Sequence, residues 1–265
     1  MKKLLLISCT LLFALVINAQ SEGDSDDFRK FKFGFKVEPN FSWMTPGSDE
    51  LVSDGVSLRA NFGLDMDFMF SDNYAFSTGI NLMGMGGNLT YLDNETRDND
   101  PFDYLVSRQR NYKLRYMEIP LTLKLRTQEI GYLTYWGQFG LGVGFITRAR
   151  ADDEIKFFLE QDPSNTAGYL ASIKEDELDE NIDISSDVIP ARASLIVGAG
   201  ADYSLSGSTA LSFGIIFNNG FTNVLKGNGI EKDDKDQPVV ENGEFKKFDL
   251  KATSSQIQLR VGLIF

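Results

Sequence analysis

Charged residues recur at alternating positions in several stretches of this sequence. Lys36 and Glu38 are one residue apart, and Asp65 and Asp67 repeat this spacing. The full set on the alternating phase comprises Lys36, Glu38, Arg59, Asp65, Asp67, Glu118, Lys124, Arg192, Asp202 and Arg260. Residues two apart on a β-strand share one face, so these side chains are expected to meet in a common interior. Because both signs are present, we predict a network of ion pairs, and carboxylate catalysis or a proton relay is the alternative.

The residue types that most catalytic sites need are scarce. The sequence has no histidine and one cysteine, Cys9. Histidine is the side chain best suited to acid–base catalysis near neutral pH and is the commonest metal ligand. We therefore predict a non-enzymatic protein with no cofactor, no metal centre and no catalytic residue. The formal net charge of −12 also argues against nucleic acid as a partner.

A second concentration of charge lies between Asp152 and Asp187. This segment holds twelve acidic residues and two lysines. Hard divalent cations bind carboxylate oxygens, but no spacing here matches a dedicated calcium-binding loop. We interpret the segment as a solvated acidic loop, with cation binding as the alternative. Arg148 and Arg150, just before it, are candidates for a rim salt bridge or for contact with a lipopolysaccharide phosphate.

The elements that position these charges are long strands with two different faces. Phe31, Phe33 and Phe35 alternate with lysine and glycine, and the alternation continues to Trp43. Strands in soluble domains usually have five or six residues, whereas a tilted strand of ten or more suits a hydrocarbon layer. In water, a sheet with so many outward Phe and Leu residues would aggregate. The pattern therefore favours a membrane barrel over a soluble β-sandwich.

Eight segments carry this pattern, at 31–43, 58–70, 74–82, 112–126, 133–150, 189–205, 209–224 and 251–265. The predicted fold is all-β, a closed antiparallel transmembrane β-barrel of about eight strands. The interior of so small a barrel is only just wide enough for its own side chains, so a filled lumen is expected. The last strand ends on Phe265, which resembles the C-terminal assembly signal of outer-membrane barrels.

Two irregularities occur within the strands. Apolar residues occupy even positions over 112–116 and odd positions over 119–125. We predict a β-bulge near Met117 that restores both faces. Glycines on the polar phase of the fifth strand are expected to leave room in the lumen for long side chains such as Arg192 and Arg148.

The connections alternate between short and long. Tight turns are expected at 71–73, 127–132 and 206–208, and long polar loops at 45–56, 92–111, 151–188 and 225–250. Outer-membrane barrels have this asymmetry, with short periplasmic turns and long extracellular loops. An even number of strands then places both ends of the barrel on the periplasmic side.

The first nineteen residues have the composition of a secretory signal peptide. Two lysines follow the initial methionine, an apolar run occupies 4–17, and Ala19 provides a small residue for cleavage. The run is shorter than the ~20 residues that a spanning helix needs. We therefore divide the chain into a signal peptide (1–19), a short acidic segment (20–29) and an exported outer-membrane barrel (30–265).

One strand carries the motif of a known family. Residues 115–124 read RYMEIPLTLK and resemble the Y-x-E-I-P-L-x-x-K strand of the PorT-type outer-membrane β-barrel family of Bacteroidota. The glycine-rich stretches 139–144 and 198–203 and the Ala-Gln end of the signal fit the same family. The resemblance covers the chain from about Phe31. It implies an outer-membrane location and a small barrel, and some members take part in gliding-associated protein secretion. It implies no catalytic residue.

Three classes of function remain, in order of preference. The first is a non-enzymatic barrel that anchors or binds through its acidic loops, as an accessory of secretion or envelope assembly. The second is a narrow channel for small solutes. The third is a barrel enzyme that cleaves lipid or peptide, which would need an all-carboxylate mechanism. The expected partners are outer-membrane lipid and lipopolysaccharide, the barrel-assembly machinery, and envelope or secretion proteins.

Overall fold

The computed structural model describes residues 31–96, 103–157, 177–233, 237–242 and 244–265. Its long strands are β1 (Phe31–Pro46), β3 (Ser57–Ser71), β4 (Tyr74–Thr96), β5 (Asp103–Arg126), β6 (Leu133–Phe157), β8 (Ala191–Ser206), β9 (Thr209–Gly220) and β14 (Ala252–Ile264). The short strands are β2 (Val52–Asp54), β7 (Glu177–Asp183), β10 (Asn228–Ile230), β11 (Val240–Glu241), β12 (Glu244–Phe245) and β13 (Lys247–Asp249). The predicted signal peptide (1–19), acidic segment (20–29) and the middle of the predicted acidic loop lie outside the described residues.

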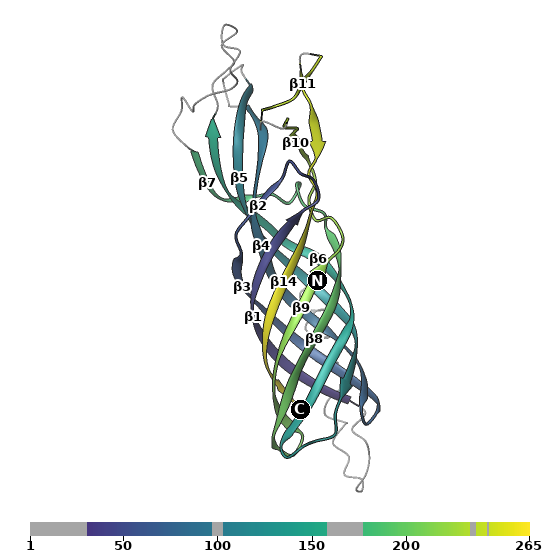
Figure 1. The fold of residues 1–265 in the computed structure, drawn as a ribbon. Coiled ribbons are helices and arrows are strands. Elements are labelled where there is room, and N and C mark those ends of the chain that lie inside the picture. Colours follow the sequence, from purple (N-terminus) through teal and green to yellow (C-terminus); the bar gives the residue numbers. More distant parts are fainter. Residues whose placement is uncertain (1–30, 97–102, 158–176, 234–236, 243) are drawn as a thin grey trace, which may run out of the picture.

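The eight long strands close into one antiparallel barrel (Figure 1). Their order around the ring is β4, β3, β1, β14, β9, β8, β6 and β5, and the pairing of β4 with β5 completes the circle. The first and last of these strands pair side by side, from Gly34 with Ile264 to Pro46 with Ala252. The predicted all-β closed barrel is therefore confirmed. Among the described residues, no helix is long and apolar enough to cross a membrane.

The two faces of the barrel wall separate aromatic from polar side chains. Along β1, Phe33, Phe35 and Phe41 are exposed on the outside, while Lys36 and Glu38 are buried inside. The exposed apolar band continues around every long strand, from Phe68 in β3 to aromatic and aliphatic residues in β14. This exterior suits a hydrocarbon layer, in which closure satisfies every backbone hydrogen bond.

Three strands continue well beyond the apolar band at the long-connection end of the barrel (Figure 1). The upper parts of β4, β5 and β6, above Leu82, Met117 and Phe145, carry β7 along β6 and β10 with β13 along β4. We call this assembly the upper sheet. The polar loop predicted at 92–111 was wrong, because β4 and β5 stay paired up to Thr96 and Asp103.

The phase change predicted in β5 near Met117 was also wrong. Even-numbered residues face inward from Tyr112 to Lys124 without interruption, so Tyr112, Leu114 and Tyr116 are buried inside and not exposed to lipid. What changes along β5 is the medium outside the barrel. The lower part carries the exposed apolar band, which suits lipid. The upper part lies beyond this band, where water is the expected medium and apolar side chains are stable only inside.

A β-bulge does occur, but in the neighbouring strand β6. Tyr116 pairs with Ile146, whereas Arg115 pairs with Arg148, so Thr147 is an extra residue. Below the bulge the outward positions of β6 are odd, and above it they are even. Arg148 is consequently exposed on the outside, and its predicted place in the lumen was wrong.

Candidate functional site

The central lumen holds a cluster of four charged side chains. Arg260 of β14 is 2.9 Å from Glu38 and 3.2 Å from Asp65, and Lys36 is 3.3 Å from Glu38 and 3.0 Å from Asp65. Three of the four are almost fully buried, and Asp65 has a side-chain exposure of 13%. Two cations thus alternate with two carboxylates, which is the arrangement that offsets the cost of burying each charge.

Further charges pair toward the short-turn end. Lys124 is 2.8 Å from Asp67, which also accepts a hydrogen bond from Ser77. Asp202 is 3.0 Å from Arg126. Arg126 was not among the predicted lumen residues, although its even number places it on the inward phase of its strand.

Trp136 supplies an aromatic surface between these groups. The centroid of its ring lies 5.2 Å from Nζ of Lys124 and 5.3 Å from the guanidinium carbon of Arg260. Gly200 and Gly214 make room for the ring, because an added Cβ would lie 2.5 and 2.6 Å from it. Trp136 was not among the predicted lumen residues, although it alternates along β6 with outward-facing Tyr135 and Phe139.

Glu118 lies at the upper limit of the polar lumen. It is 3.2 Å from Arg192 and accepts hydrogen bonds from Ser194 and from the Asn218 amide. A Cβ at Gly142 would lie 2.7 Å from the Glu118 carboxylate, so a larger residue at position 142 would collide with this carboxylate. The carboxylate is fully engaged by a cation and two donors, which suits a structural role.

Arg59 stands apart from the other predicted lumen residues. Its guanidinium donates a 3.4 Å hydrogen bond to the Tyr112 carbonyl and makes no ion pair that involves another described residue. It borders an apolar cluster that fills the top of the barrel. The cluster includes Met44, Met83, Met85, Tyr112, Leu114, Tyr116, Val224 and Leu250.

The centre of the lumen contains a small cavity. The cavity between Lys36, Glu118 and Arg260 measures about 10 Å³, which is close to the space of a single water. A larger pocket of about 380 Å³ opens at the short-turn end, beside Lys32 and Arg126. The interior is therefore packed by side chains, with an apolar layer above a charged one.

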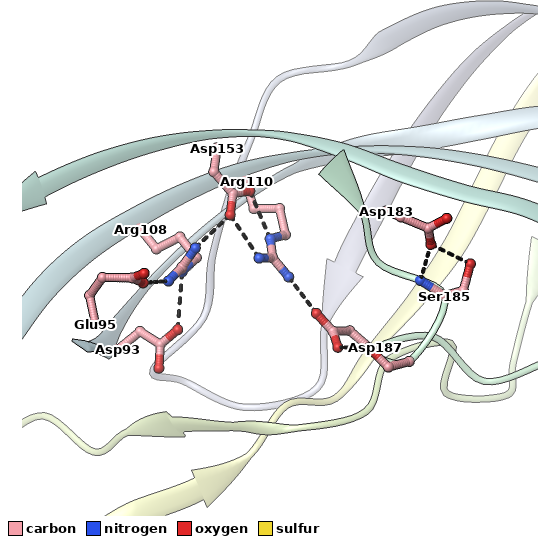
Figure 2. A network of polar contacts seen from close by, with 9 residues as sticks. Asp93, Glu95, Arg108, Arg110, Asp153, Asp183, Ser185 and Asp187 are labelled. Atoms are coloured by element: carbon pink, nitrogen blue, oxygen red, sulfur yellow. Dashed lines mark hydrogen bonds and ion pairs between the residues drawn. The ribbon is translucent and has the colours of Figure 1, made fainter. Parts of the chain in front are cut away.

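The upper sheet contains a second buried charge network (Figure 2). Asp153 of β6 lies between two arginines of β5, 2.6 Å from Arg108 and 2.7 Å from Arg110. Arg108 also contacts Asp93 of β4, and Arg110 reaches Asp187, which follows β7. The network therefore ties together three strands and the connection to β8.

Burial and charge act on the ionisation of this network. Burial lowers the pKa values of Arg108 and Arg110. The charge interaction with ionised Tyr91, which is the larger raising cause for Arg108, and hydrogen bonds to Asp153, the larger one for Arg110, outweigh burial and hold both pKa values above their usual range. Burial raises the pKa of Tyr91 to about 12. Both arginines are therefore charged and the phenol is neutral at physiological pH. Arg108 and Arg110 were not predicted as network residues, because the segment 92–111 was expected to be a polar loop.

The charged side chains of the lumen and of the upper sheet are engaged mainly by one another and by neighbouring polar groups. Within the described part of the chain, no three His, Cys, Asp or Glu side chains are grouped so that they could hold a metal ion. At the end of the last strand, Phe265 exchanges backbone hydrogen bonds with Phe33, and their rings stack at 5.2 Å.

Comparison with known proteins identifies the fold family. The family described as "Outer membrane protein beta-barrel domain" matches residues 18–226. The chain belongs to this family. As an outer-membrane barrel, the protein has its short turns on the periplasmic side and the upper sheet on the extracellular side. A search of curated proteins found no match to the sequence.

Solved outer-membrane barrels resemble this one at low sequence identity. Ail of Yersinia pestis is 10% identical, with coverage of 89% of this chain and 99% of Ail, and a TM-score of 0.36. OprG from Pseudomonas aeruginosa is 10% identical, with coverage of 89% and 94% and a TM-score of 0.39. The protease OmpT from Escherichia coli is 12% identical, with coverage of 91% and 99% and a TM-score of 0.30.

Proposed function

We propose that this protein is a non-enzymatic anchor that presents the upper sheet to a partner in the cell envelope. The observation that carries the proposal is the Arg108–Asp153–Arg110 network, which holds a sheet together beyond the membrane. Strands that only span a membrane need no such extension. A stiff extracellular sheet above a packed barrel is suited to binding, because little conformational entropy is lost when the partner docks.

The acidic edge of the upper sheet is the surface that we propose for binding. Strand β7 carries Asp179, Glu180 and Asp183 on exposed positions. A surface of this charge favours a partner with a basic face. Opposite charges speed the diffusional encounter of the two proteins, and like charges disfavour the binding of acidic proteins. The partner classes that we propose are envelope proteins and components of protein secretion, in line with the PorT-type motif at 115–124.

The route to the membrane is part of the same proposal. We propose export by the signal peptide 1–19, an acidic segment at 20–29, and assembly of the barrel from residue 30 by the barrel-assembly machinery, with Phe265 as its signal. The lumen residues, from Lys36 to Arg260, would then act as a charge network that stabilises the barrel.

A crosslinking experiment tests the binding role. The variant Asp179→Asn/Glu180→Gln keeps the shape of β7 but removes two charges. The control Asp49→Asn/Glu50→Gln makes the same change at the same end of the barrel. We expect proteins crosslinked to the wild type in outer membranes to be lost from the first variant and kept by the control. Equal capture by both variants would contradict the proposed surface.

A narrow channel is the second function in order of preference. The 10 Å³ lumen cavity and the apolar layer above it oppose conduction. Single-channel recording in planar bilayers tests this alternative. Steady conductance by the wild type that rises in Arg260→Ala would support a channel through the lumen and contradict a filled one. An enzyme ranks third, because the lumen carboxylates described here are engaged by cations and donors.

A further inference from the structure

A pair of arginines lies just above the lipid-facing band, on the outside of β5 and β6. Met117 and Phe145 are cross-strand partners and form the last exposed apolar pair. The next outward pair is Arg115 with Arg148, and both side chains are exposed. At about 3.4 Å per residue, this pair lies roughly 7 Å beyond the apolar edge, which is the depth of lipid headgroups.

A second basic pair follows on the same two strands. Lys113 and Arg150 are cross-strand partners, one step farther from the membrane. Lys113 forms an ion pair with Asp152, and Arg150 donates a 2.7 Å hydrogen bond to the Asn181 carbonyl. These two cations are thus partly engaged by the protein itself.

The lower pair has no such partner. Among the described residues, no carboxylate forms an ion pair with Arg115 or Arg148. Asp183 is the nearby acid, and its oxygen Oδ1 accepts two hydrogen bonds from Ser185. Directly opposed residues have Cβ atoms about 5 Å apart, so two facing arginines repel each other unless an anion lies between them.

The bulge at Thr147 is what creates this pair. Without the extra residue, Arg148 would point inward into the apolar cluster around Tyr116, as the regular alternation of β6 predicts. The bulge turns it outward, and the Thr147 hydroxyl donates to the Arg115 carbonyl at 3.1 Å. Bulges often re-aim a side chain. Here the bulge places two exposed arginines opposite each other on neighbouring strands, just beyond the apolar band.

We propose that Arg115 and Arg148 bind a phosphate group of a phosphorylated glycolipid in the outer leaflet. A phosphate between the two guanidinium groups accepts paired charge-assisted hydrogen bonds and turns their repulsion into attraction. The apolar band directly below receives the acyl chains of the same lipid. The upper basic pair adds positive potential from farther out. This inference does not depend on the partner of the upper sheet.

Native mass spectrometry with lipid A tests the site. The protein is held in a zwitterionic detergent with EDTA, so that divalent cations do not bridge phosphate to acids such as Asp152. The test variant is Arg115→Gln/Arg148→Gln. The control Lys226→Gln/Lys251→Gln removes two exposed positive charges at the same end, outside β5 and β6.

We expect diphosphorylated lipid A to bind the test variant at least about ten-fold more weakly than the wild type, a loss of about 1.4 kcal/mol. The control is expected to change affinity less than about two-fold, which is only a few tenths of a kcal/mol. Arg115→Lys/Arg148→Lys should lose part of the affinity, because lysine lacks the planar fork. A gel shift between unboiled and boiled samples confirms that each variant has folded.

Two outcomes overturn the proposal. Equal affinity of the wild type and the Arg115→Gln/Arg148→Gln variant for lipid A would show that the two arginines do not form the binding site. Binding of inorganic phosphate as tight as that of lipid A would reassign it to a free anion. Binding that falls when a lipid A phosphate is removed, but only in proteins that keep both arginines, supports it.

Discussion

Arg260 Nε donates a 2.9 Å hydrogen bond to Glu38 Oε1 across the seam between the first and last barrel strands. The β1–β14 register runs from Val37 with Val261 to Asn40 with Gln258, without pairs at the two positions between. One of these is Pro39, which has no amide hydrogen to donate. The ion pair therefore crosses the closure seam where its backbone ladder is interrupted.

Arg260→Ala should strongly destabilise the barrel. It leaves Glu38 and Asp65 with Lys36 as their only cation among the residues described, and breaking a buried pair costs about 3–5 kcal/mol. The loss should shrink at acidic pH, because protonation removes the unpaired carboxylate charge. Urea titration in lipid vesicles at neutral and acidic pH measures both effects. A penalty that is independent of pH would contradict the assigned electrostatic cause.

Val261→Arg tests the opposite face of the same strand. Val261 is 46% exposed between lipid-facing neighbours, so arginine there meets hydrocarbon and should cost about 2–4 kcal/mol near the midplane. Leu259→Arg should behave similarly. Folding into vesicles followed by urea titration gives the comparison, with Thr253→Arg, above the apolar band, as a control of small effect. If both buried-in-lipid variants fold as well as the wild type, the assigned face of β14 is wrong.

Asp153→Asn should loosen the upper sheet and leave the barrel intact. The change keeps the shape but leaves Arg108 and Arg110 short of their shared carboxylate, at a cost of about 3–5 kcal/mol. Hydrogen exchange should accelerate over 104–111 and remain slow over 117–125. Asp152→Asn is a matched control, because its partly exposed ion pair with Lys113 contributes less than about 1 kcal/mol. Equal hydrogen-exchange rates over 104–111 in the two variants would contradict the proposal that the network stabilises the upper sheet.

Tyr91→Phe should reduce the sensitivity of the upper sheet to alkaline pH. Burial raises the pKa of Tyr91 from 10.0 to about 12, so the folded state favours the neutral phenol. The stabilisation is complete below pH 10 and is lost as pH rises through about 12. Exchange of upper-sheet amides at several alkaline pH values, scaled for the intrinsic rate, compares the variant with the wild type. Tyr112, whose pKa burial also raises, should leave a residual dependence.

The alternation within the membrane could be predicted from the sequence because it is a local property. Each strand there has lipid on one side and a polar lumen on the other. The residue types of Phe35 and Lys36 are therefore enough to predict which face of the barrel wall each side chain occupies. The same alternation placed the ten predicted lumen residues on one phase, but it did not show which carboxylate each cation meets. In the structure, nine of them form ion pairs with described residues. Arg59 follows the phase too, but lies against a backbone carbonyl.

The upper sheet could not be predicted in this way. Above Met117 water replaces lipid outside the barrel, so the apolar phase moves to the inside while the backbone continues without a break. In the sequence this change looks like a slip of register in β5. The true bulge, at Thr147, leaves no comparable signal, because it is defined by pairing with Arg115 and Arg148 across two strands.

The sequence by itself determined the eight strand segments within the apolar band, their lipid and lumen faces, and the scarcity of catalytic groups, since these follow from residue type and a period of two. Only the tertiary structure decided which charges pair, that Asp153 joins Arg108 to Arg110, and that Arg115 and Arg148 face each other outside. These relationships connect strands that are far apart in the chain or depend on one extra residue in a neighbouring strand. Their energies arise from distances and burial, which exist only after the barrel has closed.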